Sequence, residues 1–173
     1  MSRKPLISIA IPAYNEAENI PELWQRLTAM FQGLESEYDF EVVVCENGSH
    51  DNSYEKLTEI RNIDSRLKIV RLSRNFHMEG GMLAALSKVS GDACVVMSAD
   101  LQDPPEMIPE MIKRWRSGDD HVYTVITHRH GESKFRRVAA EIFYWMIDRI
   151  SDTPVPRNAS DFRLVDKQMY EAF

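Results

Sequence analysis

A stretch in the middle of the chain joins an apolar run to acidic and amide side chains. Ala93 to Met97 is apolar and of strand length, and Asp100, Gln102 and Asp103 follow it before the pair Pro104 and Pro105. Carboxylate and carbonyl oxygens at the end of a strand can hold a hard divalent cation, with phosphate oxygens completing the coordination. The pattern therefore indicates chemistry on a nucleoside diphosphate.

These three polar side chains are expected to divide their roles. Asp100 is the predicted metal ligand and Gln102 a second ligand. Asp103 is better explained as a helix cap, because Pro104 suits the first helical position and Glu106 stands three residues after Asp103.

Two further apolar runs end in polar residues. Pro12 to Glu16 follow the run 6–11, where a nucleotide base and ribose could rest while Glu16 accepts hydrogen bonds from hydroxyl groups. Glu46 to Asp51 follow the run 40–45 and supply a carboxylate and an amide for the polar edge of a base. Both stretches also have the composition of a turn before a helix, and the residues alone leave the two interpretations open.

The next stretch, Ser73 to Met82, contains Arg74 and a glycine pair that could approach an anion, but the start of a glycine-rich helix is the favoured explanation. His128 and His130 suggest a metal pair, yet no nearby Cys or Glu completes a tetrahedral zinc set. We therefore interpret both as solvated loop histidines, with His130 able to touch phosphate.

Short apolar runs alternate with helical patterns along the chain. Strands are expected at 6–11, 40–45, 67–72, 93–97 and 122–126, and helices at 16–32, 52–62, 79–89, 105–117 and 134–150. The alternation predicts an α/β fold with a mostly parallel sheet covered by helices on both faces. Ligands of such sheets bind at the carboxyl ends of the strands. Asn15 with Glu18 matches the pattern of a capped helix start, as does Asp103 with Glu106.

The C-terminal part offers two more candidate regions. The predicted helix 134–150 has an apolar face with Tyr144 and Trp145 and a basic start; it suits core packing, and it also suits a membrane surface. In a strand, Asp161 and Arg163 would share a face. They could form an ion pair, or the acid could handle a proton or position an acceptor while the guanidinium steadies phosphate charge.

Composition narrows the class of protein. A length of 173 residues predicts one domain, and a net charge of -6 argues against binding a nucleic acid polymer. Cys45 and Cys94 lie in predicted buried strands and are expected to be reduced thiols. The apolar run 6–11 is too short for a signal peptide or a membrane span, so a cytoplasmic location is expected.

Six segments together resemble the family 2 glycosyltransferases, in particular the branch of dolichol-phosphate mannose synthase and polyprenyl-phosphate glycosyltransferases. The resemblance covers nearly the whole chain, and its segments are, in the family's order, IPAYNEAENIPEL, VVVCENGSHDNS, LSRNFHMEGGMLAAL, SADLQDPPEMIPEMI, HGESKFRR and NASDFRLVD.

The resemblance implies a single GT-A catalytic domain over residues 1–173 that transfers a sugar with inversion from a UDP- or GDP-sugar, using Mg or Mn. The implied acceptor is a lipid phosphate, a polyprenyl (undecaprenyl or dolichyl) phosphate, at the cytoplasmic face of the cell membrane, in cell-envelope glycan biosynthesis. A homo-oligomer is compatible with it. The implied nucleotide-sugar site consists of Pro12, Ala13, Tyr14, Glu16, Glu46, Ser98, Ala99 and Asp100. The implied metal ligands are Asp100 and Gln102, the implied phosphate and acceptor residues are Arg129, Lys134, Arg136 and Arg137, and the implied catalytic residues near the acceptor are Asp161 and Arg163, together with Asp100.

The chain departs from the family pattern in three places. Glu46 and Asn47 stand where the family has two Asp residues, so base recognition is expected to differ. Ser98 stands where the family has the first Asp of Asp-Ala-Asp, so metal binding is expected to be weaker or to depend on the bound diphosphate. The chain ends at Phe173, where family members commonly continue, so a truncated C-terminus is expected.

Two alternative functions can be compared with these features. Ser98 and the early end also suit a noncatalytic nucleotide-sugar-binding or assembly module. A sugar-1-phosphate nucleotidyltransferase would need a glycine-rich and basic signature after the first strand, and Pro12 to Glu16 contain none.

Overall fold

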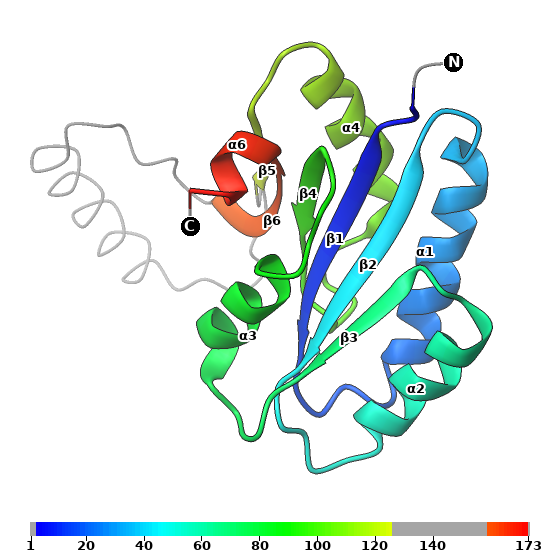
Figure 1. The fold of residues 1–173 in the computed structure, drawn as a ribbon, viewed down its shortest axis with the longest axis vertical. Coiled ribbons are helices and arrows are strands. Elements are labelled where there is room, and N and C mark those ends of the chain that lie inside the picture. Colours follow the sequence, from blue (N-terminus) through cyan, green and yellow to red (C-terminus); the bar gives the residue numbers. More distant parts are fainter. Residues whose placement is uncertain (1–2, 126–158, 173) are drawn as a thin grey trace, which may run out of the picture. The chain divides into compact units, whose positions relative to one another are not determined.

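The computed structural model describes residues 3–125 and 159–172, which form an α/β fold around a six-stranded sheet (Figure 1). The strand order is β3-β2-β1-β4-β6-β5. The pairs of β1 with β2, β2 with β3 and β1 with β4 are parallel, and β4 with β6 is antiparallel. The strands are β1 (Leu6–Ala13), β2 (Asp39–Glu46), β3 (Leu67–Arg71), β4 (Ala93–Val96), β5 (His121–Val125) and β6 (Ala159–Asp166). The helices are α1 (Ile20–Leu34), α2 (Ser53–Ile63), α3 (His77–Leu86), the 3-10 turn η1 (Pro105–Met107), α4 (Ile108–Arg116) and α6 (Lys167–Tyr170).

The chain divides into two compact units, one formed by residues 1–122 with 162–173 and the other by residues 123–161. The first unit contains β1 to β4 and most of β6, and every helix named above. The prediction that residues 1–173 form one domain stays a prediction.

The predicted mostly parallel sheet is confirmed, and each of the five expected strands is present within two residues of its predicted bounds. The strands in the middle of the sheet are almost wholly buried, because helices cover both of their faces. The predicted helix 134–150 lies outside the described residues.

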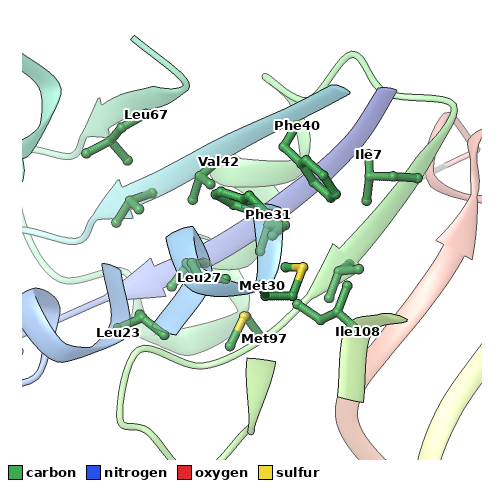
Figure 2. Close-up of a cluster of buried hydrophobic side chains, with 14 of the residues drawn as sticks. Ile7, Leu23, Leu27, Met30, Phe31, Phe40, Val42, Leu67, Met97 and Ile108 are labelled. Carbon is green, nitrogen blue, oxygen red and sulfur yellow. The ribbon is translucent and has the colours of Figure 1, made fainter. Parts of the chain in front are cut away.

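The two faces of the sheet bury different side chains of the same strands. Ile7, Ile9 and Ile11 of β1 belong to the cluster that includes the buried face of α1, which Figure 2 shows around Phe31 and Phe40. The alternate residue Ala10 belongs to the cluster on the α3 side. This period of two is the geometry of a strand, and it explains why β1, apart from the buried Ser8, is apolar on both faces.

Both cysteines lie in this buried sheet and are free thiols, as predicted. Burial raises the pKa of Cys45 to about 11, with a further contribution from the charge of Glu46, and burial raises the pKa of Cys94 to about 12. Thiols with such a high pKa form little thiolate near neutral pH, so we expect them to be chemically inert.

A buried carboxylate ties β1, β2 and β3 together at the end of the sheet away from their carboxyl termini. Glu41 is 5% exposed and accepts hydrogen bonds from the Ser8 hydroxyl, the Lys68 ammonium group and both the backbone N–H and the hydroxyl of Ser90. Burial raises the pKa of Glu41, but the hydrogen bonds from Lys68, Ser8 and Ser90 outweigh it, and the net pKa is lowered. Glu41 is therefore held as a carboxylate.

Candidate functional site

The loop after β1 is bound by hydrogen bonds to the loop after β2. Asn15 has a φ of 58°, a backbone conformation that Asn tolerates better than most residues. Its N–H donates to Ser49 Oγ (3.0 Å) and its Oδ1 accepts the N–H of His50 (2.9 Å). The N–H of Glu16 donates to Ser53 Oγ (2.8 Å). The two strand ends therefore form one connected layer.

This arrangement corrects the predicted helix start at Asn15 and Glu18. Helix α1 begins at Ile20, and its cap residue Asn19 makes no side-chain capping hydrogen bond. The oxygen of Asn15 is already used by His50, which lies 35 residues later in the chain. A partner distant in sequence has replaced the local cap.

Glu46, at the end of β2, is 1% exposed. Its Oε1 accepts the N–H of Ser49, and its Oε2 lies 3.2 Å from Arg71 Nε. Among the described residues, Glu46 Oε2 is the one buried side-chain oxygen or nitrogen without a hydrogen-bond partner. The Arg71 guanidinium also stacks 3.9 Å from the centroid of the Tyr54 ring.

The loop between β3 and α3 packs tightly against the end of β2. Asn47 Oδ1 accepts the N–H of Phe76 (2.9 Å), and Asn47 Nδ2 donates to the carbonyl of His77 (2.8 Å). Gly48 has a φ of 70°, and a Cβ added there would lie 2.5 Å from the backbone carbon of Arg74. Only glycine therefore fits at this contact between the two loops.

These loops enclose a cleft of about 290 Å³ at the carboxyl ends of the parallel strands, which we call the strand-end cleft. Its position is where ligands bind in open α/β sheets. Its lining residues are Pro12, Ala13, Tyr14, Glu16, Asn47, Asn75, His77, Met78 and Ser98.

The predicted nucleotide-sugar residues divide between the cleft and its surroundings. Five of them line it, namely Pro12, Ala13, Tyr14, Glu16 and Ser98. Glu46, Ala99 and Asp100 are outside its lining, although each is next to or two residues from one that lines it. Tyr14 has a half-exposed ring whose centroid lies 6.3 Å from that of His50, in an edge-on arrangement.

The β3–α3 loop contributes to this cleft, although its sequence carries only a weak indication of a role near an anion. Asn75, His77 and Met78 line it, yet the pattern of their segment favoured a simple helix start. His77 has a φ of 62°, which is unusual for a residue other than glycine, but this angle cannot be read from the sequence. The neighbouring glycine pair was the one signal available.

The segment after β4 folds back on itself. The N–H of Ser98 donates to Asp103 Oδ2 (2.8 Å), and the N–H of Gln102 donates to Asp100 Oδ1 (3.1 Å). Leu101 between them has a φ of 64°. Asp100 is half-buried and Gln102 is exposed, so both side chains can be reached from solvent.

The predicted helix cap at Asp103 is wrong. The turn η1 begins after Pro104, which makes no side-chain capping hydrogen bond, and an oxygen of Asp103 instead accepts the N–H of Ser98. The acid thus stabilises the turn that carries Asp100.

The side-chain oxygens after β4 fit a hard divalent cation that is also coordinated by a diphosphate. Asp100 offers a carboxylate, and Ser98 and Gln102 offer neutral oxygens. No group of three or more His, Cys, Asp or Glu side chains suited to a metal is found among residues 3–125 and 159–172. Mg²⁺ is commonly held by one or two carboxylates with substrate phosphates and water, so this small set fits when the diphosphate is bound.

Asp161 and Arg163 lie on β6. Phe162 and Leu164 are buried in the core while Arg163 between them is half-buried and pairs in register with Val96 of β4. Asp161 is exposed and belongs to the second unit. The remaining predicted residues, Arg129, Lys134, Arg136 and Arg137, with His128 and His130, lie outside the described residues.

Comparison with known proteins identifies the family. Residues 8–173 match the family model described as "Glycosyl transferase family 2". The chain belongs to this family. The predicted resemblance to family 2 glycosyltransferases is thereby confirmed.

Curated relatives of this family 2 chain include bacterial and phage proteins. The "Uncharacterized glycosyltransferase YkcC" of Bacillus subtilis is 41% identical over 169 residues, which make up 98% of this chain and 52% of that protein. The "Prophage bactoprenol glucosyl transferase homolog" of Escherichia coli is 33% identical over 165 residues, 95% of this chain and 53% of that protein. The chain spans about half the length of the curated relatives it matches.

Solved structures of glycosyltransferases share the fold. A mannosyltransferase from Pyrobaculum calidifontis in complex with GDP-Man and Mn²⁺ has a TM-score of 0.66 at 17% identity, covering 99% of this chain and 47% of that one. Glucosyl-3-phosphoglycerate synthase from Mycobacterium tuberculosis, in complex with Mn²⁺, UDP-glucose and phosphoglyceric acid, has a TM-score of 0.64 at 20% identity, covering 95% and 58%. The predicted GT-A fold is confirmed. None of the described helices has the length and apolar character needed to cross a membrane.

Proposed function

We propose that this protein transfers a sugar, with inversion, from a UDP- or GDP-sugar to a polyprenyl phosphate. The observation that carries the proposal is the strand-end cleft in a chain of glycosyltransferase family 2. One cavity is lined by the ends of β1 and β2, by Ser98 after β4 and by the β3–α3 loop.

The nucleotide half of the donor would occupy the side of the cleft formed by Tyr14, Glu16 and Asn47. The half-exposed Tyr14 ring offers an apolar face to a base. Glu16 accepts a hydrogen bond from Asn19 Nδ2 (2.7 Å) and keeps further acceptor capacity for ribose hydroxyls. Glu46 is buried beside Asn47 and outside the lining of the cleft, so it would support the base site by holding the loop after β2 through the N–H of Ser49.

The diphosphate would lie toward Ser98 and Asp100. Asp100, with Gln102, would hold Mg or Mn together with diphosphate oxygens, and the metal would neutralise charge on the departing diphosphate. Ala99 is buried between Ser98 and Asp100 and fixes the spacing of their side chains. With Ser98 instead of a second carboxylate, metal binding would depend strongly on the nucleotide.

The acceptor assignment draws on relatives named bactoprenol glucosyl transferases, which are 33% identical to this chain. A lipid phosphate oxygen is already anionic and attacks the anomeric carbon from the side opposite the leaving diphosphate, so a strong general base is unnecessary. Arg129, Lys134, Arg136 and Arg137 would attract acceptor or donor phosphate at the membrane surface. Asp161 and Arg163 would position the acceptor.

The test is a transfer assay with the complete natural protein. Radiolabelled UDP-glucose and GDP-mannose are each incubated with undecaprenyl or dolichyl phosphate, with Mn²⁺, Mg²⁺ or EDTA, and both lipid-linked sugar and released nucleoside diphosphate are measured. The proposal expects both products in equal amounts from at least one donor. Donor binding without either product would contradict it.

A noncatalytic nucleotide-sugar-binding module is the second candidate, and Ser98 is the observation that favours it. Its backbone N–H is bound to Asp103, and its side chain replaces a carboxylate ligand of the family pattern. Such a module would bind UDP or GDP with an affinity independent of Mn²⁺. It would not cleave the bond between the sugar and the nucleoside diphosphate.

A further inference from the structure

We propose that His77 contacts the donor directly and donates a hydrogen bond from its imidazole to the nucleoside diphosphate, so that it helps determine donor affinity. The inference rests on the proposed function, because it assumes that a nucleotide occupies the strand-end cleft. It adds a binding residue from the β3–α3 loop to those at the ends of β1, β2 and β4.

The backbone of His77 lies in a strained region. Its φ is 62°, in the left-handed region where a Cβ is unfavourable and where glycine is the default residue. Residues held in such conformations cluster at ligand sites, where the surrounding structure compensates the strain. His, like Asn, adopts this conformation more often than most residues, and its place on the cleft wall makes residue 77 a candidate for a ligand contact.

Three hydrogen bonds hold the loop in this conformation. The side chain of Asn47, which is 2% exposed, binds the N–H of Phe76 and the carbonyl of His77. Asn75 Oδ1 accepts the N–H of His77 (2.7 Å). The backbone at residue 77 is thus fixed before any ligand arrives, which reduces the entropy lost on binding.

The side chain of His77 is exposed on the wall of the cleft. Within the described residues its ring makes no hydrogen bond and no ion pair, since its known contacts use only backbone atoms. Arg74, the nearest basic residue along the chain, stacks 4.0 Å above the Phe76 ring and does not line the cleft.

The chemistry of the lining identifies the class of ligand group. Among the nine lining residues, His77 is the one whose side chain can become cationic, and Glu16 is the one acid. The diphosphate of a nucleoside diphosphate presents anionic oxygens, and an imidazole N–H donor suits them. The structure therefore favours a contact between His77 and an oxygen of the donor.

The experiment separates a binding role from a structural one through two variants. His77→Gly removes the ring and also relieves the left-handed strain, so we expect an unfolding temperature equal to or above that of the wild type, and affinity for UDP or GDP lower by about fivefold to tenfold. His77→Gln keeps a hydrogen-bond donor and is expected to lose less affinity than His77→Gly. Calorimetry with each nucleotide, with and without Mn²⁺, measures the affinities.

A matched control lies on the same helix. Leu83 is 54% exposed on α3 and does not line the cleft, so Leu83→Ala should bind nucleotide as the wild type does. Equal affinity of wild type and His77→Gly would overturn the inference and leave the proposed function intact. A lower unfolding temperature together with weaker binding in His77→Gly would make the residue structural and would also overturn it. A wild type that binds neither UDP nor GDP would instead refute the proposed function.

Discussion

The side-chain amide of Asn47 binds the backbone on both sides of the peptide link between Phe76 and His77, with Oδ1 2.9 Å from the N–H of Phe76 and Nδ2 2.8 Å from the carbonyl of His77. One buried residue at the end of β2 thereby sets the position of the loop after β3. The width of the strand-end cleft depends on this contact, because Asn47 and His77 both line it.

We expect Asn47→Asp to destabilise the protein. The carboxylate can still accept the N–H of Phe76, but it has no donor for the carbonyl of His77. Its second oxygen would lie against the carbonyl oxygen of His77. The free energy of unfolding at pH 7 should fall by about 1–3 kcal/mol, the cost of an unsatisfied buried polar group. Urea denaturation measures this change. Asn62→Asp, at an exposed position on α2, is the control and should change it by less than about 0.5 kcal/mol.

Asp100→Ala should abolish the part of donor binding that depends on metal. Without its carboxylate, the predicted metal site retains the neutral oxygens of Ser98 and Gln102, and the Asp103 carboxylate accepts the N–H of Ser98. We expect UDP or GDP to bind the variant with the same affinity in Mn²⁺ and in EDTA, as measured by calorimetry. Asp119→Ala, in the exposed loop after α4, should keep the wild-type response. A metal dependence that survives in Asp100→Ala would assign the metal to other residues.

Ser98→Asp should tighten metal binding. The substitution adds a second hard carboxylate two residues from Asp100, on a residue that lines the cleft. The apparent Mn²⁺ affinity, measured by titration in the presence of saturating UDP or GDP, should rise about tenfold or more. No gain would mean that the side chain at position 98 faces away from the ion.

Glu41→Gln should change how stability depends on pH. Burial opposes the charged form of Glu41, but hydrogen bonds lower its net pKa in the folded state. Its contribution to stability is therefore complete above the ordinary Glu pKa of about 4.3 and is lost as the pH falls through the lower folded-state pKa.

The comparison is made by urea denaturation at pH 7 and at successively lower pH. We expect Glu41→Gln to lose about 2–3 kcal/mol at pH 7, because Lys68 loses its charged partner, and to lose less further stability than the wild type on acidification. Glu37→Gln, an exposed position between α1 and β2, should follow the wild-type curve. Identical acid dependence in Glu41→Gln and wild type would refute the assignment.

The sequence by itself determined the sheet and the edge where the site lies. Apolar runs of strand length alternated with helical patterns, and β1 to β5 formed where these runs predicted, because strands buried on both faces are mostly apolar. The sixth strand, β6, was not among the expected strands. The polar residues at Pro12 to Glu16 and at Ser98 were also predictable, since parallel strands bring their carboxyl ends to one edge.

Only the tertiary structure decided which polar side chains meet. Asn15 and Asp103 each had the pattern of a helix cap, yet Asn15 binds His50 and Asp103 binds Ser98. A local pattern cannot reveal that a partner from elsewhere competes for the same oxygen. The contact of Asn47 with His77 likewise joins residues 30 positions apart, and it is this packing of two loops that makes His77 part of the cleft.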